Sequence, residues 1–190
     1  VAVTGVQTCA LPISMTTFHQ INVVRYLIMT LAGVLSQATA AQGIVRQHQL
    51  TSALANEAVG VAVNVCAKSG HAVTAVIVNI DGVRQSMLRG DGAAVHTLDS
   101  AYAKAYTAAS LAPVRKEDST KAIFERLNKA PGMTTAGLAS LPNINFTPGG
   151  VTIMNGDQVL GGIGVGGAPG GNFDDDCARA ALAIIKDRIR

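Results

Sequence analysis

Few residues in this sequence stand in a pattern that could carry out chemistry, and the histidines are the first to consider. His48 and His71 flank the first expected helix, where each is most simply a solvated end residue. His96 follows a glycine-containing turn at the start of a second expected helix, with Lys104 and Thr107 on a similar face of that helix. We interpret His96 either as a residue that can reach out to a ligand or as a helix end without one.

Tyr102 and Tyr106 stand beside these residues, four positions apart, so they share one face of the same expected helix. Packing in a protein core would explain both aromatic rings without any ligand. A tyrosine next to a histidine and a lysine could also line a binding site. The residues alone leave both interpretations open.

Several well-known kinds of site are missing from the sequence. It contains no zinc-type Cys/His spacing, no H-E-x-x-H, no G-x-S-x-G and no C-x-x-C-H haem-attachment motif. The segment 162–167 fits the dinucleotide pattern G-x-G-x-x-G, but Asp174, Asp175 and Asp176 at the start of the next helix would repel a phosphate. We therefore interpret the glycine-rich stretch 149–171 as a hairpin. Its glycines leave room for another backbone or a ligand to come close.

The first forty residues have the features of a leader. Residues 1–14 precede the first methionine, Met15, and carry no charge, so we expect them to be non-native read-through. Residues 15–40 follow the order of a signal peptide, with Arg25, a short apolar run and an Ala-Thr-Ala cleavage site at 38–40. The apolar run is shorter than the roughly twenty residues that span a bilayer. The alternative is an N-terminal buried helix.

Cleavage would leave one domain over residues 41–190, in a periplasmic or secreted protein with no further attachment to a membrane. The net charge of +3 falls to +2 with the loss of Arg25, which is too small to indicate nucleic acid or an anionic membrane as partner. Cys66 and Cys177 remain, and both fall in expected helices among apolar neighbours. We expect two buried thiols. A disulfide, which an oxidising compartment permits, is the alternative.

Hydrophobic periodicity predicts helices over 49–69, 97–111 and 119–129 and from Asn172 onward, and strands over 72–80, 83–89, 151–154 and 158–165. Turns are expected at Asp81-Gly82 and Asn155-Gly156, and Pro113 is expected to stop the second helix. On the last helix we expect a buried stripe of Phe173, Cys177, Ala180, Ala181, Ile184 and Ile185. The order α-ββ-αα-ββ-α predicts an α+β domain with an antiparallel sheet covered by helices.

Two segments of the sequence carry a resemblance to a known family. The first is Asp81-Gly82, Arg89-Gly90-Asp91-Gly92-Ala93, Asp99-Ser100-Ala101 and Lys104-Ala105-Tyr106-Thr107-Ala108; the second is Gly149-Gly150-Val151, Gly161-Gly162-Ile163-Gly164-Val165-Gly166-Gly167 and Asp175-Asp176-Cys177-Ala178. Together they resemble the GlcG/HbpS family of haem-binding proteins. The sequence departs from the family at Gly166, where a serine is frequent, and at Asp176, where a glutamate is frequent.

The resemblance implies a profilin-like fold and a homo-oligomer, from dimer to octamer. It also implies haem as a non-covalent cofactor that is stored, sensed or slowly degraded. Family members do not share one axial ligand, but His and Tyr are common ligands of haem iron. His96 is then the expected iron ligand, with Arg89 and Lys104 for the propionates, Tyr106 as an aromatic wall or second candidate ligand, and Thr107 beside them.

Two other functions stay open at this stage. Some members of the family are linked to glycolate, so the protein could be an enzyme or accessory protein for a small organic acid, with Arg89 and Lys104 holding the carboxylate. It could also be a structural oligomer that binds no ligand.

Overall fold

The computed structural model of the chain describes residues 43, 45–129 and 136–189. The expected read-through at 1–14 and the signal peptide at 15–40 lie outside the described residues. The fold described below is that of the compact unit Gln47–Arg190. None of the helices in the described ranges combines the length and the apolarity that crossing a membrane requires.

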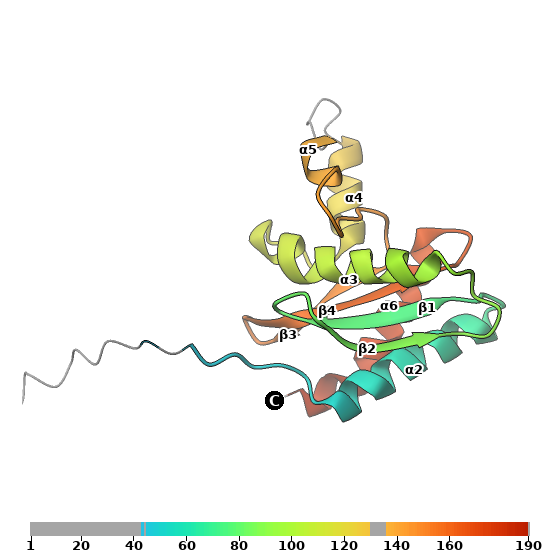
Figure 1. The fold of residues 1–190 in the computed structure, drawn as a ribbon, viewed down its shortest axis with the longest axis horizontal. Coiled ribbons are helices and arrows are strands. Elements are labelled where there is room, and N and C mark those ends of the chain that lie inside the picture. Colours follow the sequence, from blue (N-terminus) through green and yellow to red (C-terminus); the bar gives the residue numbers. More distant parts are fainter. Residues whose placement is uncertain (1–42, 44, 130–135, 190) are drawn as a thin grey trace, which may run out of the picture. The chain divides into compact units, whose positions relative to one another are not determined.

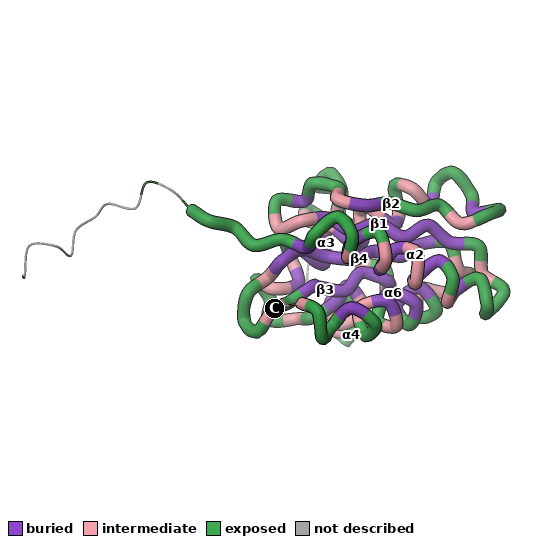
Figure 2. Tube along the Cα trace, turned by 90° about the horizontal axis from the view of Figure 1, so that it is seen from below, coloured by how far each residue is buried: buried purple, intermediate pink, exposed green. Residues whose placement is uncertain are grey.

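Four antiparallel strands form one sheet in the order β2-β1-β4-β3 (Figure 1). Their bounds are β1 Thr74–Asn79, β2 Arg84–Arg89, β3 Gly150–Asn155 and β4 Gln158–Gly166. Each sequence-local pair is a hairpin, and the two hairpins join where β1 pairs with β4. β1 and β4 are therefore the central strands, and they are buried along most of their length (Figure 2). The predicted α+β fold with an antiparallel sheet covered by helices is confirmed.

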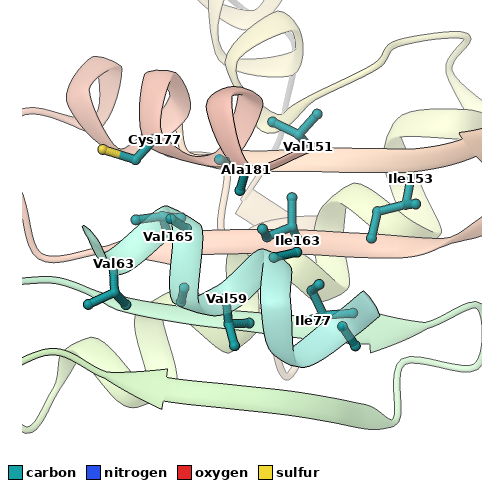
Figure 3. Packing of buried hydrophobic residues seen from close by; sticks show 14 of the residues in the cluster. Val59, Val63, Ile77, Val151, Ile153, Ile163, Val165, Cys177 and Ala181 are labelled. Carbon is teal, nitrogen blue, oxygen red and sulfur yellow. The ribbon is translucent and has the colours of Figure 1, made fainter. Parts of the chain in front are cut away.

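Helices α2 (Ser52–Lys68) and α6 (Gly171–Ile185) cover one face of the sheet (Figure 1). The Thr51 hydroxyl caps α2 by accepting a hydrogen bond from the Leu54 N–H at 3.3 Å. Side chains alternate across a strand, so one face receives every second residue. On this face those residues are branched and apolar, and they meet the two helices in the main core, which includes Val59, Val63, Ile77, Val151, Ile153, Ile163 and Val165 (Figure 3).

Cys66 and Cys177 form a disulfide between α2 and α6, with Cα atoms 5.7 Å apart. The expectation of two free thiols is therefore wrong. Both residues were correctly predicted to lie in helices among apolar neighbours. The sequence does not reveal that the two helices pack side by side, because 111 residues separate the two cysteines.

Helix α3 (Thr97–Val114) covers the opposite face of the sheet, where every second residue of β4 is a glycine. A Cβ atom built on Gly164 would lie 2.1 Å from the Ala101 carbonyl oxygen and 2.4 Å from the Ala105 nitrogen. A Cβ on Gly162 would lie 2.4 Å from the Ala105 carbonyl oxygen. The glycines thus leave room for a helix backbone, which was one of the two occupants expected from the sequence.

Several predicted boundaries need correction. The tight turn between β3 and β4 is Gly156-Asp157, because Asn155 pairs with Gln158. Pro113 lies in the last turn of α3, and the helix ends one residue after it, at Val114. Phe173 and Ile184 are 49% and 58% exposed, and the buried face of α6 instead includes Asp174 and Asp175.

The chain between α3 and β3 forms the remaining helices, α4 (Thr120–Lys129) and the short α5 (Ala136–Ala139). Ser119 caps α4, since its hydroxyl accepts a hydrogen bond from the Ala122 N–H at 3.2 Å. α5 was not expected, because the segment 133–148 lacks helical periodicity. A 3-10 turn, Lys186–Arg188, follows α6.

The packing of α3 on β4 predicts that Gly164→Val destabilises the protein by about 3 kcal/mol or more. Backbone atoms of α3 occupy the space of the new side chain, and a packed helix cannot move aside without losing its other contacts. Gly60→Ala is the control, since nothing lies within 4 Å of its added Cβ and alanine favours a helix, so a gain of up to about 1 kcal/mol is expected. Urea unfolding measures both, and equal midpoints would contradict this account.

The disulfide predicts a large effect of reduction on stability. A crosslink that closes a long loop restricts the unfolded chain, so its removal should cost about 2–5 kcal/mol. Thermal unfolding of the Cys66→Ala/Cys177→Ala variant and of the oxidised wild type measures this difference. An unchanged midpoint in the double variant would show that the crosslink contributes nothing to stability.

Candidate functional site

His96 occupies the N-cap position of α3, next to the loop that follows β2. Its side chain is exposed and makes no capping hydrogen bond. Thr97 is the first helical residue and is buried, with its hydroxyl 2.7 Å from that of Thr74 and 2.6 Å from the Ala94 carbonyl oxygen. The buried Thr97 hydroxyl thus holds the start of the helix, whereas the His96 side chain is exposed to solvent.

Arg89 is held against the same loop. Its Nε donates a hydrogen bond to the Ala93 carbonyl oxygen at 2.7 Å, and its Nη2 donates to the same oxygen. The Nη1 of the guanidinium takes no part in these bonds. The structure thus places Arg89 at one end of a short loop and His96 at the other end. The His96 imidazole makes no capping hydrogen bond.

Lys104 lies in the interior, away from that loop. Its ammonium group donates to the Asp174 carboxylate at 2.7 Å, and the two side chains are only 4% and 3% exposed. The pair joins α3 to the start of α6. Burial raises the pKa of the Asp174 carboxyl, although the Lys104 charge and hydrogen bonds from the Ala168 and Gly167 backbone lower it. Contact between Lys104 and a propionate would require breaking this pair.

Tyr106 and Thr107 lie further along α3 than His96. Ten residues separate His96 from Tyr106, which corresponds to about 15 Å along a helix axis. The Tyr106 ring packs against Gly82 in the β1–β2 turn and lies 6.1 Å from the Tyr102 ring. Thr107 is buried, and its hydroxyl donates to the Ala103 carbonyl oxygen at 2.8 Å. The two residues therefore lie in a different part of the structure from the His96 loop.

His71 and Phe173 were not singled out as a pair from the sequence, but their rings lie 4.8 Å apart. His71 also lines a cavity of about 360 Å³ together with Asn64, Gly90 and Asp91. The only sequence signal was the position of His71 just after a helix, which does not identify a partner 102 residues away. The two rings are tilted by 46°, and His96 has no such ring contact with any described residue.

The second family motif contributes to the structure through buried acids. Asp175 is 1% exposed and accepts a hydrogen bond from Arg179 at 2.8 Å. Arg179 also pairs with Asp118 at 2.9 Å, and this hydrogen bond holds the pKa of the Asp118 carboxyl below its usual value. Within the described ranges, no three His, Cys, Asp or Glu side chains gather as a metal site.

Comparison with known proteins gives a consistent result. Residues 50–183 match the model of the family described as haem-degrading, HbpS-like proteins. The crystal structure of HbpS shares 32% sequence identity with the chain at a TM-score of 0.66, and covers 78% of this chain and 98% of HbpS. The crystal structure of a double mutant of HbpS from Streptomyces reticuli shares 33% sequence identity at a TM-score of 0.66. This match covers 78% of this chain and 94% of the mutant chain.

A more distant structure has the same fold. The complex of PduOC with haem shares 21% identity at a TM-score of 0.60, over 72% of this chain and 94% of that one. No curated protein is significantly similar to the chain.

The buried pair predicts strong coupling between Lys104 and Asp174. Lys104→Met and Asp174→Asn should each destabilise the protein by about 3–5 kcal/mol, because each leaves one polar or charged group buried without its partner. The double variant should lose clearly less than the sum of the two. Chemical denaturation of all four proteins gives the coupling energy. Additive losses would mean that the pair does not act as a unit.

Proposed function

The chain belongs to the HbpS-like family of haem-degrading proteins, and on this basis we propose that it is an exported protein that binds haem without covalent attachment. The bound haem would be stored, sensed or slowly degraded. The observation that carries the proposal is the match to the family over most of the described unit. The haem complex of PduOC supports the same ligand for this fold.

We assign the axial position to His96. Its imidazole is exposed and uncommitted, and a neutral imidazole is a good ligand for haem iron. Arg89 stands at the other end of the same loop, and its Nη1 can hydrogen-bond a propionate. Val95, 73% exposed beside His96, offers an apolar contact for the ring. These residues fit haem, which when bound would supply the redox chemistry of its iron.

The rival functions have less support from the same residues. A small organic acid would need cations, but Lys104 is committed to Asp174, which leaves Arg89 alone at the loop. A structural oligomer that binds no ligand would not explain why the exposed His96 makes no capping hydrogen bond at the end of the loop that begins after Arg89. Homo-oligomerisation itself is compatible with haem binding. The exposed side chains of Val83, Met87 and Leu88, in and beside the edge strand β2, are apolar surface that association could cover.

Export is supported by the disulfide. Disulfides persist in oxidising compartments and are rare in reducing ones, so the Cys66–Cys177 bond agrees with the signal peptide predicted at 15–40. We therefore propose a periplasmic or secreted location.

Titration with haemin tests the proposal. The wild-type protein should give a saturable shift of the Soret band, and His96→Ala should weaken binding by about tenfold or more and change the spectrum.

His48→Ala and His71→Ala are the matched controls, and both should keep the wild-type spectrum. If all three variants bound haemin as the wild type does, His96 would be excluded as ligand. If the wild type gave no saturable shift, haem binding itself would be wrong for this protein, and a small organic acid would become the better candidate.

A further inference from the structure

We propose that the cavity beside Tyr106 is a binding site for a small neutral aromatic molecule, separate from the loop that carries His96. The cavity has a volume of about 410 Å³, within the range of roughly 300–1,000 Å³ common for small-molecule sites. One wall comes from α3, with Tyr106, Ser110 and Leu111. The other comes from residues 138–144.

Both walls are fixed before any ligand arrives. The buried Thr107 hydroxyl accepts a hydrogen bond from the Asn145 N–H at 2.9 Å, which ties the second wall to α3. The Tyr106 ring is held against the β1–β2 turn, since a Cβ added to Gly82 would lie 2.5 Å from its Cε2 atom. A site with such fixed walls needs little ordering when a ligand binds.

The chemistry of the lining defines the class of ligand. Leu111, Leu138, Leu141 and Ile144 make it largely apolar, and none of the described residues that line it is charged. An anion would lose its water there without gaining a cation, which disfavours haem with its two propionates. An aromatic ring can pack in offset fashion on Tyr106.

Hydrogen bonding favours a ligand with one polar group. The Ser110 hydroxyl already donates to the Tyr106 carbonyl oxygen at 2.7 Å. Tyr106 lines the cavity, and its hydroxyl has no hydrogen bond to any residue of the described ranges. A neutral aromatic molecule with one hydroxyl or carbonyl group suits both the apolar lining and the Tyr106 hydroxyl.

Calorimetric titration of the full chain with 2-naphthol tests the proposal, and naphthalene-2-sulfonate is the matched anion with the same ring system. We expect saturable 1:1 binding of 2-naphthol and about tenfold or weaker binding of the sulfonate. Tyr106→Phe keeps the ring and removes the hydroxyl, so affinity should fall by about three- to tenfold.

Leu141→Asp places a carboxylate at a position that is 51% exposed, and should weaken 2-naphthol binding by about tenfold or more. Ile184→Asp is the matched control, because Ile184 is 58% exposed and lies on α6, which covers the other face of the sheet. It should leave the affinity unchanged. Ser110→Phe, which fills the cavity without adding charge, should also abolish binding.

The proposal is overturned if 2-naphthol does not bind saturably, if the sulfonate binds equally well, or if Leu141→Asp and Ser110→Phe bind like the wild type while keeping its thermal midpoint. Haemin titration of the same variants separates this site from the proposed haem site. Retained 2-naphthol binding in His96→Ala, with retained haemin binding in Leu141→Asp, supports two sites. If a folded Leu141→Asp variant lost both 2-naphthol and haemin binding, the two ligands would share one site, and the proposal of a separate site would be overturned.

Discussion

The close contact between α3 and the glycine-bearing face of the sheet is the constraint on which the rest of the structure depends. Glycine at 162 and 164 and alanine at 101, 105 and 109 let a helix backbone lie directly on β4. On the other face the same strands carry branched residues, which form the larger core with α2 and α6. Alternation along a strand therefore gives this sheet one face for close backbone packing and one for side-chain packing. The position and direction of α3 follow from this close packing on the glycine-bearing face.

The residues that resemble the family motifs divide into two kinds once α3 is in place. Lys104 is buried and joins α3 to α6 through its pair with Asp174. Asp175 is also buried, and it bonds to Arg179 of its own helix. Such ion pairs are costly to desolvate, so their value lies in fixing one arrangement of α3 and α6 more than in net stability. Arg89 and His96 remain on an exposed loop, where chemistry with a ligand can take place.

Because α3 is a rigid rod across the sheet, its length separates two surfaces. His96 lies at the N-terminal end of the helix, and Tyr106, further along it, lines a cavity without charged side chains among the described residues. The loop with Arg89 favours an anionic ligand, whereas the cavity without charged side chains favours a neutral one. The proposed haem ligand and the proposed site for a neutral molecule would therefore lie at separate positions along one helix.

The sequence by itself determined the hairpins, the main helices, the α+β class and the place of His96 at a helix start, because these depend on local periodicity, turn residues and caps. It could not decide the partners of Cys66, Lys104 and His71. Those partners are Cys177, Asp174 and Phe173, each 70 or more residues away along the chain. Local patterns contain no information about which distant segments pack together. Only the tertiary structure therefore showed that a lysine suited to a ligand is a buried structural residue, and that two expected thiols are a crosslink.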